Sequence, residues 1–291
     1  MSDRRYVLVT AARNEEAYIE RTINSVLEQT HLPAKWVIVS DRSTDRTDQI
    51  AKKYARENGF IEVVRREDSD GSKGFASKVA AINLGYEHLR QLRYDFFGNL
   101  DADLSFSPHY YERLVEEFEK NPKLGIAGGF IQERYNGVFK HRPSNSLRSV
   151  AGGTQFFRRQ CYEDIGGLKP FELGGEDWCA EIMARMAGWE VQAIPYLTVF
   201  HHKRSIEARG ALREPFREGM VDYLFGSHAI FEIVKCIGRI VERPSVISAG
   251  ARMSGYLWAC LTKKSKVLSA TQIRFLRAEQ IRRLSATLGM R

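Results

Sequence analysis

The chain of 291 residues has few cysteines and no long uninterrupted hydrophobic run. Its cysteines, Cys161, Cys179, Cys236 and Cys260, are widely spaced and include no Cys-x-x-Cys pair. This spacing argues against a disulfide framework and against a structural zinc site. The first residues lead directly into a strand pattern and lack the apolar stretch of a secretory signal. The sequence therefore predicts a protein that stays in the reducing cytoplasm where it is made.

The chain also lacks internal repeats and low-complexity linkers. Its most apolar segment, residues 246–261, is interrupted by Arg252 and at 16 residues is shorter than the roughly 20 needed to span a bilayer. Apolar residues make up 43% of the chain, which is enough to bury a full core. The length fits one large α/β domain with an appendage, or two small domains.

The net charge of +8 is concentrated in the last third of the chain. Residues 203–291 carry 17 Lys and Arg against 7 Asp and Glu, whereas the remainder carries 27 against 29. From about residue 213 the pattern is helical only, with one apolar stripe and one basic stripe (Leu224, Phe231, Val234 and Val241; Lys235, Arg239 and Arg243). Two interpretations stay open. The basic side faces anionic lipid in the headgroup region, or the helices pack on the rest of the protein or on a second subunit.

Strand and helix patterns alternate in the first hundred residues. Apolar runs at 5–11, 36–40, 60–64 and 94–100 predict strands, and the spacing at 15–30, 45–58 and 76–92 predicts helices. Three strand–helix units in succession imply parallel strands joined by right-handed crossovers, as in nucleotide-binding half-domains. The second half is mixed, with helices expected at 109–121 and 177–188 and strands at 125–134, 154–158, 190–194 and 196–200.

Polar segments follow these strands where the chain leaves the sheet. They are residues 10–16, 39–45 and the acidic turn Asp101-Ala102-Asp103, and a fourth segment, 78–85, begins the third helix. In open α/β sheets ligands bind outside the carboxyl ends of the strands. Carboxylates there are suited to Mg²⁺ or Mn²⁺ on a phosphorylated ligand.

The order of these four segments resembles that of the inverting family 2 glycosyltransferases of the GT-A fold. That family has a Pro-Ala-Tyr-Asn-Glu-type loop, then Asp-Asp-Gly-Ser-Thr-Asp, a Lys-Ala-x-Ala-Leu-Asn-x-Gly helix and an Asp-x-Asp turn. The match spans about residues 5–205, and the ordered combination is more specific than any one element. The chain departs from the pattern at Ala11 (usually proline), Arg13 (an aromatic residue), Ser40 (aspartate) and Arg42 (glycine).

The resemblance implies a Rossmann-like mixed sheet flanked by helices. We expect a GT-A domain at residues 1–205, with a nucleotide half at about 1–105 and an acceptor half at about 106–205. Residues 206–291 are then a basic, amphipathic helical extension.

The resemblance also implies roles in donor binding. Asp41 hydrogen-bonds the base, Glu15 and the Ala11 backbone line the ribose, and Lys78 lies toward the base or diphosphate. Asp101 contacts the ribose or a water on the metal, and Asp103 binds Mn²⁺ or Mg²⁺ directly. Simpler roles stay open, because Asp41 and Asp45 are also suited to capping the second helix and Lys78 to an exposed helix position.

In the second half, a glycine turn at 173–178 presents Glu176 and Asp177 at a helix start. Inverting glycosyl transfer needs one carboxylate to take the proton of the acceptor hydroxyl. The resemblance assigns this base to Asp177, with Glu176 orienting the acceptor or the turn. The alternative for Asp177 is a helix cap favoured by the macrodipole. Trp178 is suited to stacking on a sugar or to filling core.

Two adjacent histidines complete the implied site. The family pattern assigns His201 to the metal or diphosphate, with His202 in reserve, and neighbours on a strand point to opposite faces. Lys203, Arg204 and Arg209 are candidates for a loop over the diphosphate, and the turn at Gly152-Gly153 for a close backbone approach.

The predicted function is metal-dependent, inverting transfer of a sugar from a UDP- or GDP-type donor to an acceptor hydroxyl. The chain lacks a Gln-x-x-Arg-Trp segment, which favours single addition, to a lipid-linked or envelope or exopolysaccharide saccharide. We expect a cytoplasmic protein, peripheral on the inner membrane face, that does not bind nucleic acid; a homodimer is left open. The alternatives are a sugar nucleotidyltransferase, which would require a glycine-rich basic loop after the first strand, and a non-catalytic binding protein.

Overall fold

The computed structural model describes residues 4–67, 71–135, 137–203, 212–239 and 245–287. The chain divides into two compact units, residues 1–203 and 204–291. Each unit is considered by itself below.

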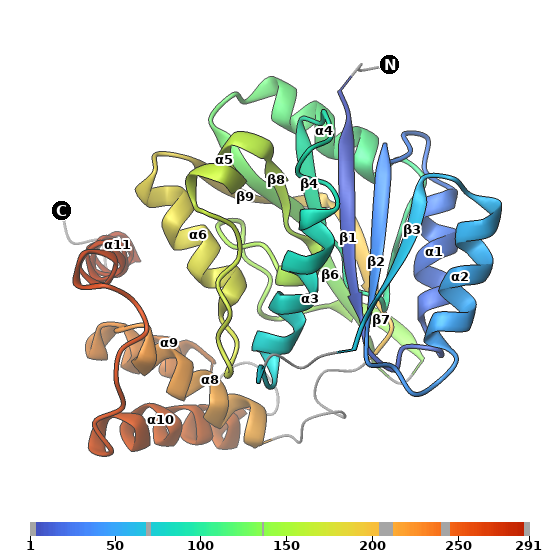
Figure 1. Ribbon diagram of the computed structural model, residues 1–291. Coiled ribbons are helices and arrows are strands. Elements are labelled where there is room, and N and C mark those ends of the chain that lie inside the picture. The colour runs from blue at the N-terminus through green and yellow to red at the C-terminus, as the bar shows by residue number, and fades with distance from the viewer. Residues whose placement is uncertain (1–3, 68–70, 136, 204–211, 240–244, 288–291) are drawn as a thin grey trace. The chain divides into compact units, whose positions relative to one another are not determined.

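The first unit is built on one sheet with helices on both faces (Figure 1). The strands follow the order β3-β2-β1-β4-β8-β6-β9-β5, with β7 paired to β6. Their bounds are β1 Tyr6–Ala12, β2 Lys35–Asp41, β3 Ile61–Arg66, β4 Phe96–Asn99, β5 Leu104–Phe106, β6 Leu124–Tyr135, β7 Val138–His141, β8 Phe156–Arg158 and β9 Glu190–His201. The helices are α1 Ile19–Leu27, α2 Thr47–Glu57, α3 Phe75–Glu87, α4 Tyr110–Lys120, α5 Arg159–Asp164 and α6 Glu176–Met186, with a 3₁₀ turn, η1, at Gly152–Thr154.

The first four strands are parallel, which confirms the three strand–helix units. The chain places β2 and β3 on one side of β1 and then returns to place β4 on the other side. The carboxyl ends of β1 and β4 are therefore the point where the strand order reverses, and open sheets of this kind bind ligands there.

Parallel strands buried on both faces are apolar throughout. In β2, Trp36 and Ile38 face the core layer under α1, α2 and α4, whereas Val37 and Val39 face the layer under α3 and α5. Gly85 of α3 allows this second layer to be tight, because a Cβ there would lie 2.7 Å from a methyl of Val9. The last residue of the 78–85 segment is thus explained by packing.

The second half of the sheet is mixed, as predicted. β8 is antiparallel to β4 and β6, and β9 is parallel to β6 and antiparallel to β5. Two details differ from expectation. The predicted strands 190–194 and 196–200 are one strand, β9, with an irregular register opposite Gly129 and Phe130. The predicted strand at 154–158 begins only at Phe156, because Gly152–Thr154 forms η1.

The second unit contains helices only among its described residues, as the sequence predicts. They are α8 Arg213–Leu224, α9 Ala229–Arg239, α10 Ser245–Leu261 and α11 Ala270–Thr287. In the described part of the chain, no helix combines the length and the apolar character needed to cross a bilayer. Val241 and Arg243, which the sequence placed on the two stripes, lie outside the described residues.

Candidate active site

The acidic turn lies at the point where the strand order reverses. β4 ends at Asn99, and residues 101–103 turn the chain into β5. β5 pairs with the end of β9, so that Leu104 lies opposite His201. The Nε2 atom of His201 consequently lies 3.1 Å from Oδ2 of Asp103. Burial alone would raise the pKa of Asp103, but its contact with His201 holds it below the usual value.

Lys78 links the third helix to the same turn. Its Nζ atom lies 2.5 Å from Oδ1 of Asp101. Burial would lower the pKa of Lys78, but the charges of Asp101 and Glu176 outweigh burial and raise it. The start of α3 and the loop before α6 also meet, since Phe75 N–H donates to the carbonyl of Glu172. Lys78 is therefore a cation held among acids, not the freely exposed helix charge of the simpler interpretation.

Glu15 joins this group from the loop after β1. Its Oε1 accepts a hydrogen bond of 2.6 Å from Lys203, and its Oε2 is buried without a hydrogen-bond partner in the described structure. Burial raises the pKa of Glu15; Lys203 partly offsets this, and the charges of Asp103 and Asp101 add to it. Glu15 thus lies close enough to the acidic turn for the charges of Asp101 and Asp103 to raise its pKa.

The turn at Gly152-Gly153 connects the acidic turn to α6. A Cβ on Gly153 would lie 2.3 Å from Cγ of Asp101, and one on Gly152 would lie 3.2 Å from Cβ of Asp177. The Gly152 N–H donates to Oδ2 of Asp177, and the Asp101 N–H donates to the carbonyl of Gly153. The turn at Gly152 and Gly153 thus lies between Asp101 and Asp177, close to both side chains.

Glu176 and Asp177 occupy different environments at the start of α6. Gly174 and Gly175, both at positive φ, turn the chain into this helix. Glu176 is 6% exposed, and burial together with the charge of Asp177 raises its pKa to about 7. Asp177 is half-buried, and its Oδ1 accepts from the N–H of Trp178. Asp177 therefore makes a cap-like contact and also reaches the glycine turn.

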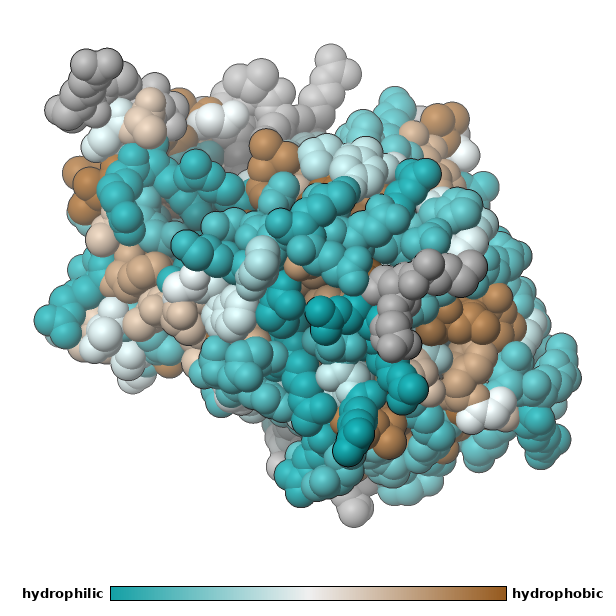
Figure 2. Space-filling model, turned by 90° about the horizontal axis from the view of Figure 1, so that it is seen from above, coloured by the Kyte–Doolittle hydropathy of each residue, from teal (hydrophilic) through white to brown (hydrophobic). Residues whose placement is uncertain are grey.

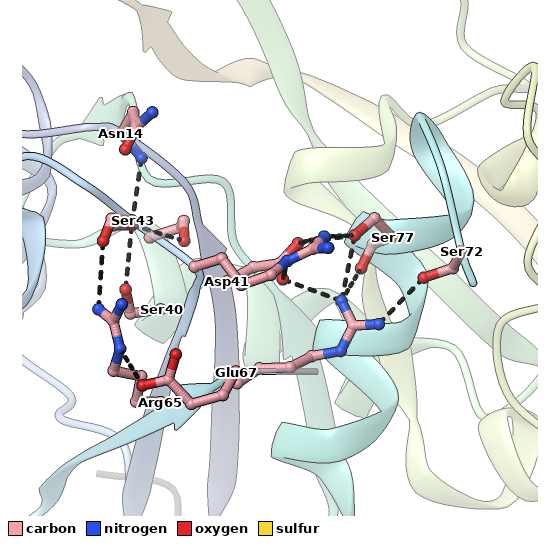
Figure 3. Close-up of polar contacts among 11 residues, drawn as sticks. Asn14, Ser40, Asp41, Ser43, Arg65, Glu67, Ser72 and Ser77 are labelled. Atoms are coloured by element: carbon pink, nitrogen blue, oxygen red, sulfur yellow. Dashed lines mark hydrogen bonds and ion pairs between the residues drawn. The ribbon is translucent and has the colours of Figure 1, made fainter. Parts of the chain in front are cut away.

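Asp41 lies in a separate polar network at the ends of β2 and β3 (Figure 3). Its Oδ1 accepts from Arg66 and Arg42, and its Oδ2 from Ser77 and Arg42. Burial would raise the pKa of Asp41, but the bonds from Arg42 and Ser77 and the charge of Arg66 hold it below its usual value. Ser77 precedes Lys78 in α3, so one helix start contributes to both groups.

Asp41 does not cap the second helix, whereas Asp45 does bond to its start. Oδ1 of Asp45 accepts from the N–H of Thr47, the first residue of α2. The loops after β1 and β2 are also joined, because Oδ1 of Asn14 accepts from the N–H of Thr44. Ala11 pairs with Val39 within β1 and β2 at this edge.

Arg42 adopts a left-handed backbone conformation, with φ of 55°. This explains why glycine is usual at this position in the pattern, since L-residues other than glycine adopt such angles only at a cost. Arg42 compensates through its ion pair with Asp41.

The adjacent histidines face different partners, as expected for neighbours in a strand. His201 contacts Asp103, whereas His202 lies 2.7 Å from the hydroxyl of Ser105 and 2.9 Å from Arg21. Burial and the charge of Arg21 lower the pKa of His202 to about 4. Arg204 and Arg209, also named as loop candidates, lie outside the described residues.

The sequence interpretation missed three side chains. Arg66 was overlooked because β3 extends two residues beyond the end of the apolar run at 60–64, although the strand-end rule would have identified it. Glu181 lies one helical turn after Asp177 on α6, and its Oε1 accepts the N–H of Val150 at 2.6 Å. Glu133 lies 3.8 Å from Nδ1 of His201; only the pairing of β6 with β9 brings them together.

The residues present fit a divalent cation. Among the described residues no three His, Cys, Asp or Glu side chains form a preset metal group. Asp103 and His201 nevertheless lie together, and Oδ1 of Asp103 is buried without a hydrogen-bond partner in the described part of the chain. Mg²⁺ is usually bound by one or two carboxylates, with substrate phosphates and waters completing its shell. Two protein donors are therefore enough.

The fold is that of the GT-A glycosyltransferases. Two solved structures illustrate the likeness. One is GalNAc-T7 with UDP, GalNAc and Mn²⁺, at a TM-score of 0.62 and 15% identity over 97% of this chain and 57% of that one. The other is the mannosyltransferase PcManGT of Pyrobaculum calidifontis in complex with GDP-Man and Mn²⁺, at 0.59 and 17% over 100% and 88%.

Comparison of the amino-acid sequence identifies the family within this fold class. The model of glycosyl transferase family 2 matches residues 7–185, and the chain belongs to that family. Among its curated relatives is a poly-β-1,6-N-acetyl-D-glucosamine synthase of Staphylococcus epidermidis, 30% identical over 174 residues, which are 54% of this chain and 40% of the relative. The chain thus spans less than half the length of that relative.

Proposed function

We propose that this chain transfers a sugar from a nucleotide-sugar to an acceptor hydroxyl, with inversion. One observation carries the proposal. Acids from the β4–β5 turn and the start of α6 surround Lys78 at the point where the strand order reverses, and Glu15 of the loop after β1 lies near the same acidic turn. Acids brought together at that point are suited to a cation and a diphosphate.

In this proposal Asp103 and His201 hold Mn²⁺ or Mg²⁺, and Lys78 holds Asp101 in place. A bound divalent cation would stabilise the negative charge of the departing nucleoside diphosphate. Lys203 is 38% exposed on its side chain and paired with Glu15, so it is placed to exchange this partner for a phosphate oxygen. Solved GT-A structures with Mn²⁺ and UDP or GDP-Man support the cation and the donor class.

The Asp41 network is the proposed site for the base. Four hydrogen bonds already use the acceptor positions of the Asp41 carboxylate. A base N–H must therefore replace one of them. Arg42 is the partner to move, because its side chain is 24% exposed whereas that of Arg66 is 8% exposed. The Ala11 backbone and Glu15 line the ribose beside this network.

Asp177 is the proposed base for the acceptor hydroxyl. A general base must first be within reach of the proton, and only then does its pKa matter. Burial and the charge of Asp177 raise the pKa of Glu176 to about 7, but its side chain is buried, at 6% exposure. Asp177 is half-buried and retains free lone pairs after two backbone hydrogen bonds. Glu176 instead positions the turn beside Lys78.

The acceptor in this proposal is an envelope or exopolysaccharide saccharide, including a lipid-linked one, to which one sugar is added at the cytoplasmic side. The names of the curated relatives as polysaccharide synthases support this class of product. Single addition rests on the absent Gln-x-x-Arg-Trp segment.

The test compares Asp177→Asn with Glu176→Gln in the full chain, supplied with UDP- and GDP-sugars and Mn²⁺. We expect Asp177→Asn to reduce transfer by at least about a hundredfold, the usual size of a general-base contribution, while donor binding is retained. Glu176→Gln should retain more activity than Asp177→Asn. Unchanged turnover in Asp177→Asn contradicts the base assignment, and pyrophosphate release from a nucleoside triphosphate and a sugar phosphate favours the nucleotidyltransferase instead.

A further inference from the structure

Helix α9 in the second unit turns the charged side chains of Glu232 and Lys235 inward and several apolar side chains outward. Glu232 is fully buried, whereas Ile230, Ile233 and Ile237 are 58%, 48% and 59% exposed. These isoleucines recur at spacings of three and four residues and so share one side of the helix. The sequence pattern placed Lys235 on the basic stripe; in the structure its Nζ donates to Asp222 at 3.0 Å.

Helix α10 has the same inverted polarity. Arg252 is the one charged residue in its sequence and is 5% exposed. The opposite side of the helix carries apolar residues that are 50% to 79% exposed: Val246, Ile247, Leu257, Trp258 and Leu261. A helix on the surface of a water-soluble domain normally shows the reverse arrangement. By contrast, the face of the molecule in Figure 2 is mostly hydrophilic.

The inward charges neutralise one another. Arg252 pairs with Glu218 and Asp222 of α8 and with Glu232 of α9, the last at 2.9 Å. Lys235 also pairs with Asp222. Buried charges require such partners. The charged side chains inside the unit are thus paired with opposite charges, and they do not make the outer sides of α9 and α10 polar.

The inner side of α10 is occupied by α8. A Cβ on Gly255 would lie 1.9 Å from the carbonyl of Phe216, and one on Gly219 would lie 1.8 Å from the carbonyl of Arg252. Two glycines therefore let the helix backbones touch. Because this contact already uses the inner side, the apolar outer side is not the surface on which α10 packs within its unit.

We propose that the outer apolar sides of α9 and α10, called here the α9–α10 outer face, dock onto an anionic lipid bilayer. At about 1.5 Å per residue the two helices are roughly 16 and 26 Å long, too short to cross the hydrocarbon core. They lie along the membrane plane, as monotopic helices do. Trp258 is of the type that favours the interface.

The positive charge of the second unit favours anionic lipid as the partner of the α9–α10 outer face. Exposed Lys263 and Lys264 lie just after α10, and residues 204–291 carry 16 Lys and Arg against 7 Asp and Glu, a balance of +9. Anionic lipid attracts such a basic surface. A second copy of the chain would instead bring two strongly positive units together. The proposal is independent of the sugar-transfer assignment.

The experiment measures binding of the full chain to phosphatidylcholine vesicles with and without phosphatidylglycerol. We expect binding to the anionic vesicles that falls as salt rises. The double variant Trp258→Ser/Leu261→Ser should lower the vesicle partition coefficient by roughly tenfold or more. Lys263→Gln/Lys264→Gln should lower it by a similar factor on anionic vesicles and little on neutral ones.

The matched control is Leu147→Ser in the first unit, where Leu147 is 58% exposed; it should leave vesicle binding unchanged. All variants should keep the unfolding midpoint of the parent, because the substituted side chains are exposed. The absence of binding to anionic vesicles at low salt overturns the proposal. If sedimentation analysis then shows a dimer that Trp258→Ser/Leu261→Ser dissociates, the α9–α10 outer face binds a second copy of the chain instead.

Discussion

Single side chains in this chain acquire their chemistry from where the backbone places them. Asp177 and Glu181 lie one turn apart on α6 and accept the N–H groups of Gly152 and Val150, two residues apart on the facing segment. The two carboxylates thus fasten the glycine turn to the helix. Glu181 is 1% exposed, and burial raises its pKa to about 8.

The raised pKa of Glu181 makes stability depend on pH. Between the ordinary glutamate pKa of about 4.3 and the value of about 8, the folded state holds a proton that the unfolded state has lost. The free energy of unfolding therefore falls as pH rises through this window, by about 1.4 kcal/mol per unit of pKa difference. We expect Glu181→Gln, which keeps an acceptor for Val150, to flatten that fall in denaturant titrations at pH 5 and pH 8.

Glu57→Gln, at an exposed position of α2, is the control for the loss of one carboxyl group. An equal pH dependence in Glu181→Gln and the parent chain would contradict the buried, protonated state of Glu181.

Arg42 offers a second test at the scale of single residues, because substitutions can separate the effect of its backbone φ of 55° on stability from the effect of its side chain. Arg42→Gly and Arg42→Ala both remove the ion pair with Asp41, but only glycine also removes the strain. We expect the glycine variant to be more stable than the alanine variant by about 1 kcal/mol in denaturant unfolding. Equal stabilities would show that the left-handed conformation is not adopted.

Among the elements, the 3₁₀ turn η1 does the most to assemble the site. Its two glycines separate the Asp-x-Asp turn from α6, and neither position leaves room for a side chain without movement. Glycine here is required by the close approach of side chains, because neither residue has a positive φ.

Gly153→Ala should therefore displace Asp101, whose Cγ would lie 2.3 Å from the new methyl group. We expect transfer activity to fall by at least about tenfold, since small misplacements of catalytic groups have effects of this size or larger. Gly59→Ala is the matched control, because nothing lies within 4 Å of its added Cβ. Full activity in Gly153→Ala would mean that Asp101 is not held by this turn.

On the scale of the whole molecule, the proposed donor site joins residues from the loop after β1 to the segment that follows β9; Glu15 and Lys203, which pair there, are 188 positions apart. A ligand that bridges these elements stabilises the folded chain by mass action, by about 2.7 kcal/mol at a hundredfold excess over its dissociation constant.

We expect the correct nucleotide-sugar with Mn²⁺ to raise the thermal unfolding midpoint by several degrees, and the nucleotide-sugar without a divalent cation to raise it less. Asp103→Asn should remove most of the difference between these two conditions. A shift that is the same with and without the cation, in both proteins, would contradict a metal role for Asp103.

Local signals in the sequence determined much of this protein. The apolar runs, the helical spacings and the polar residues after each strand were sufficient for the parallel half of the sheet and for the Asp101 to Asp103 turn. These features follow from residue periodicity and from the rule that parallel strands end at one edge. The family resemblance also selected His201 and Asp177 as members of the site, and the structure brings them beside Asp103 and the glycine turn.

Only the tertiary structure decided which groups face one another. Glu133 meets His201 because β6 pairs with β9 in one register, and Glu181 reaches Val150 because η1 brings that segment against α6. The inverted polarity of α9 and α10 could likewise not be predicted from the sequence, since a helical stripe indicates that one side is buried but does not identify that side. The burial of Arg252 among three carboxylates determines which side of α10 faces the interior, because a charged side chain is buried only where opposite charges from other helices pair with it.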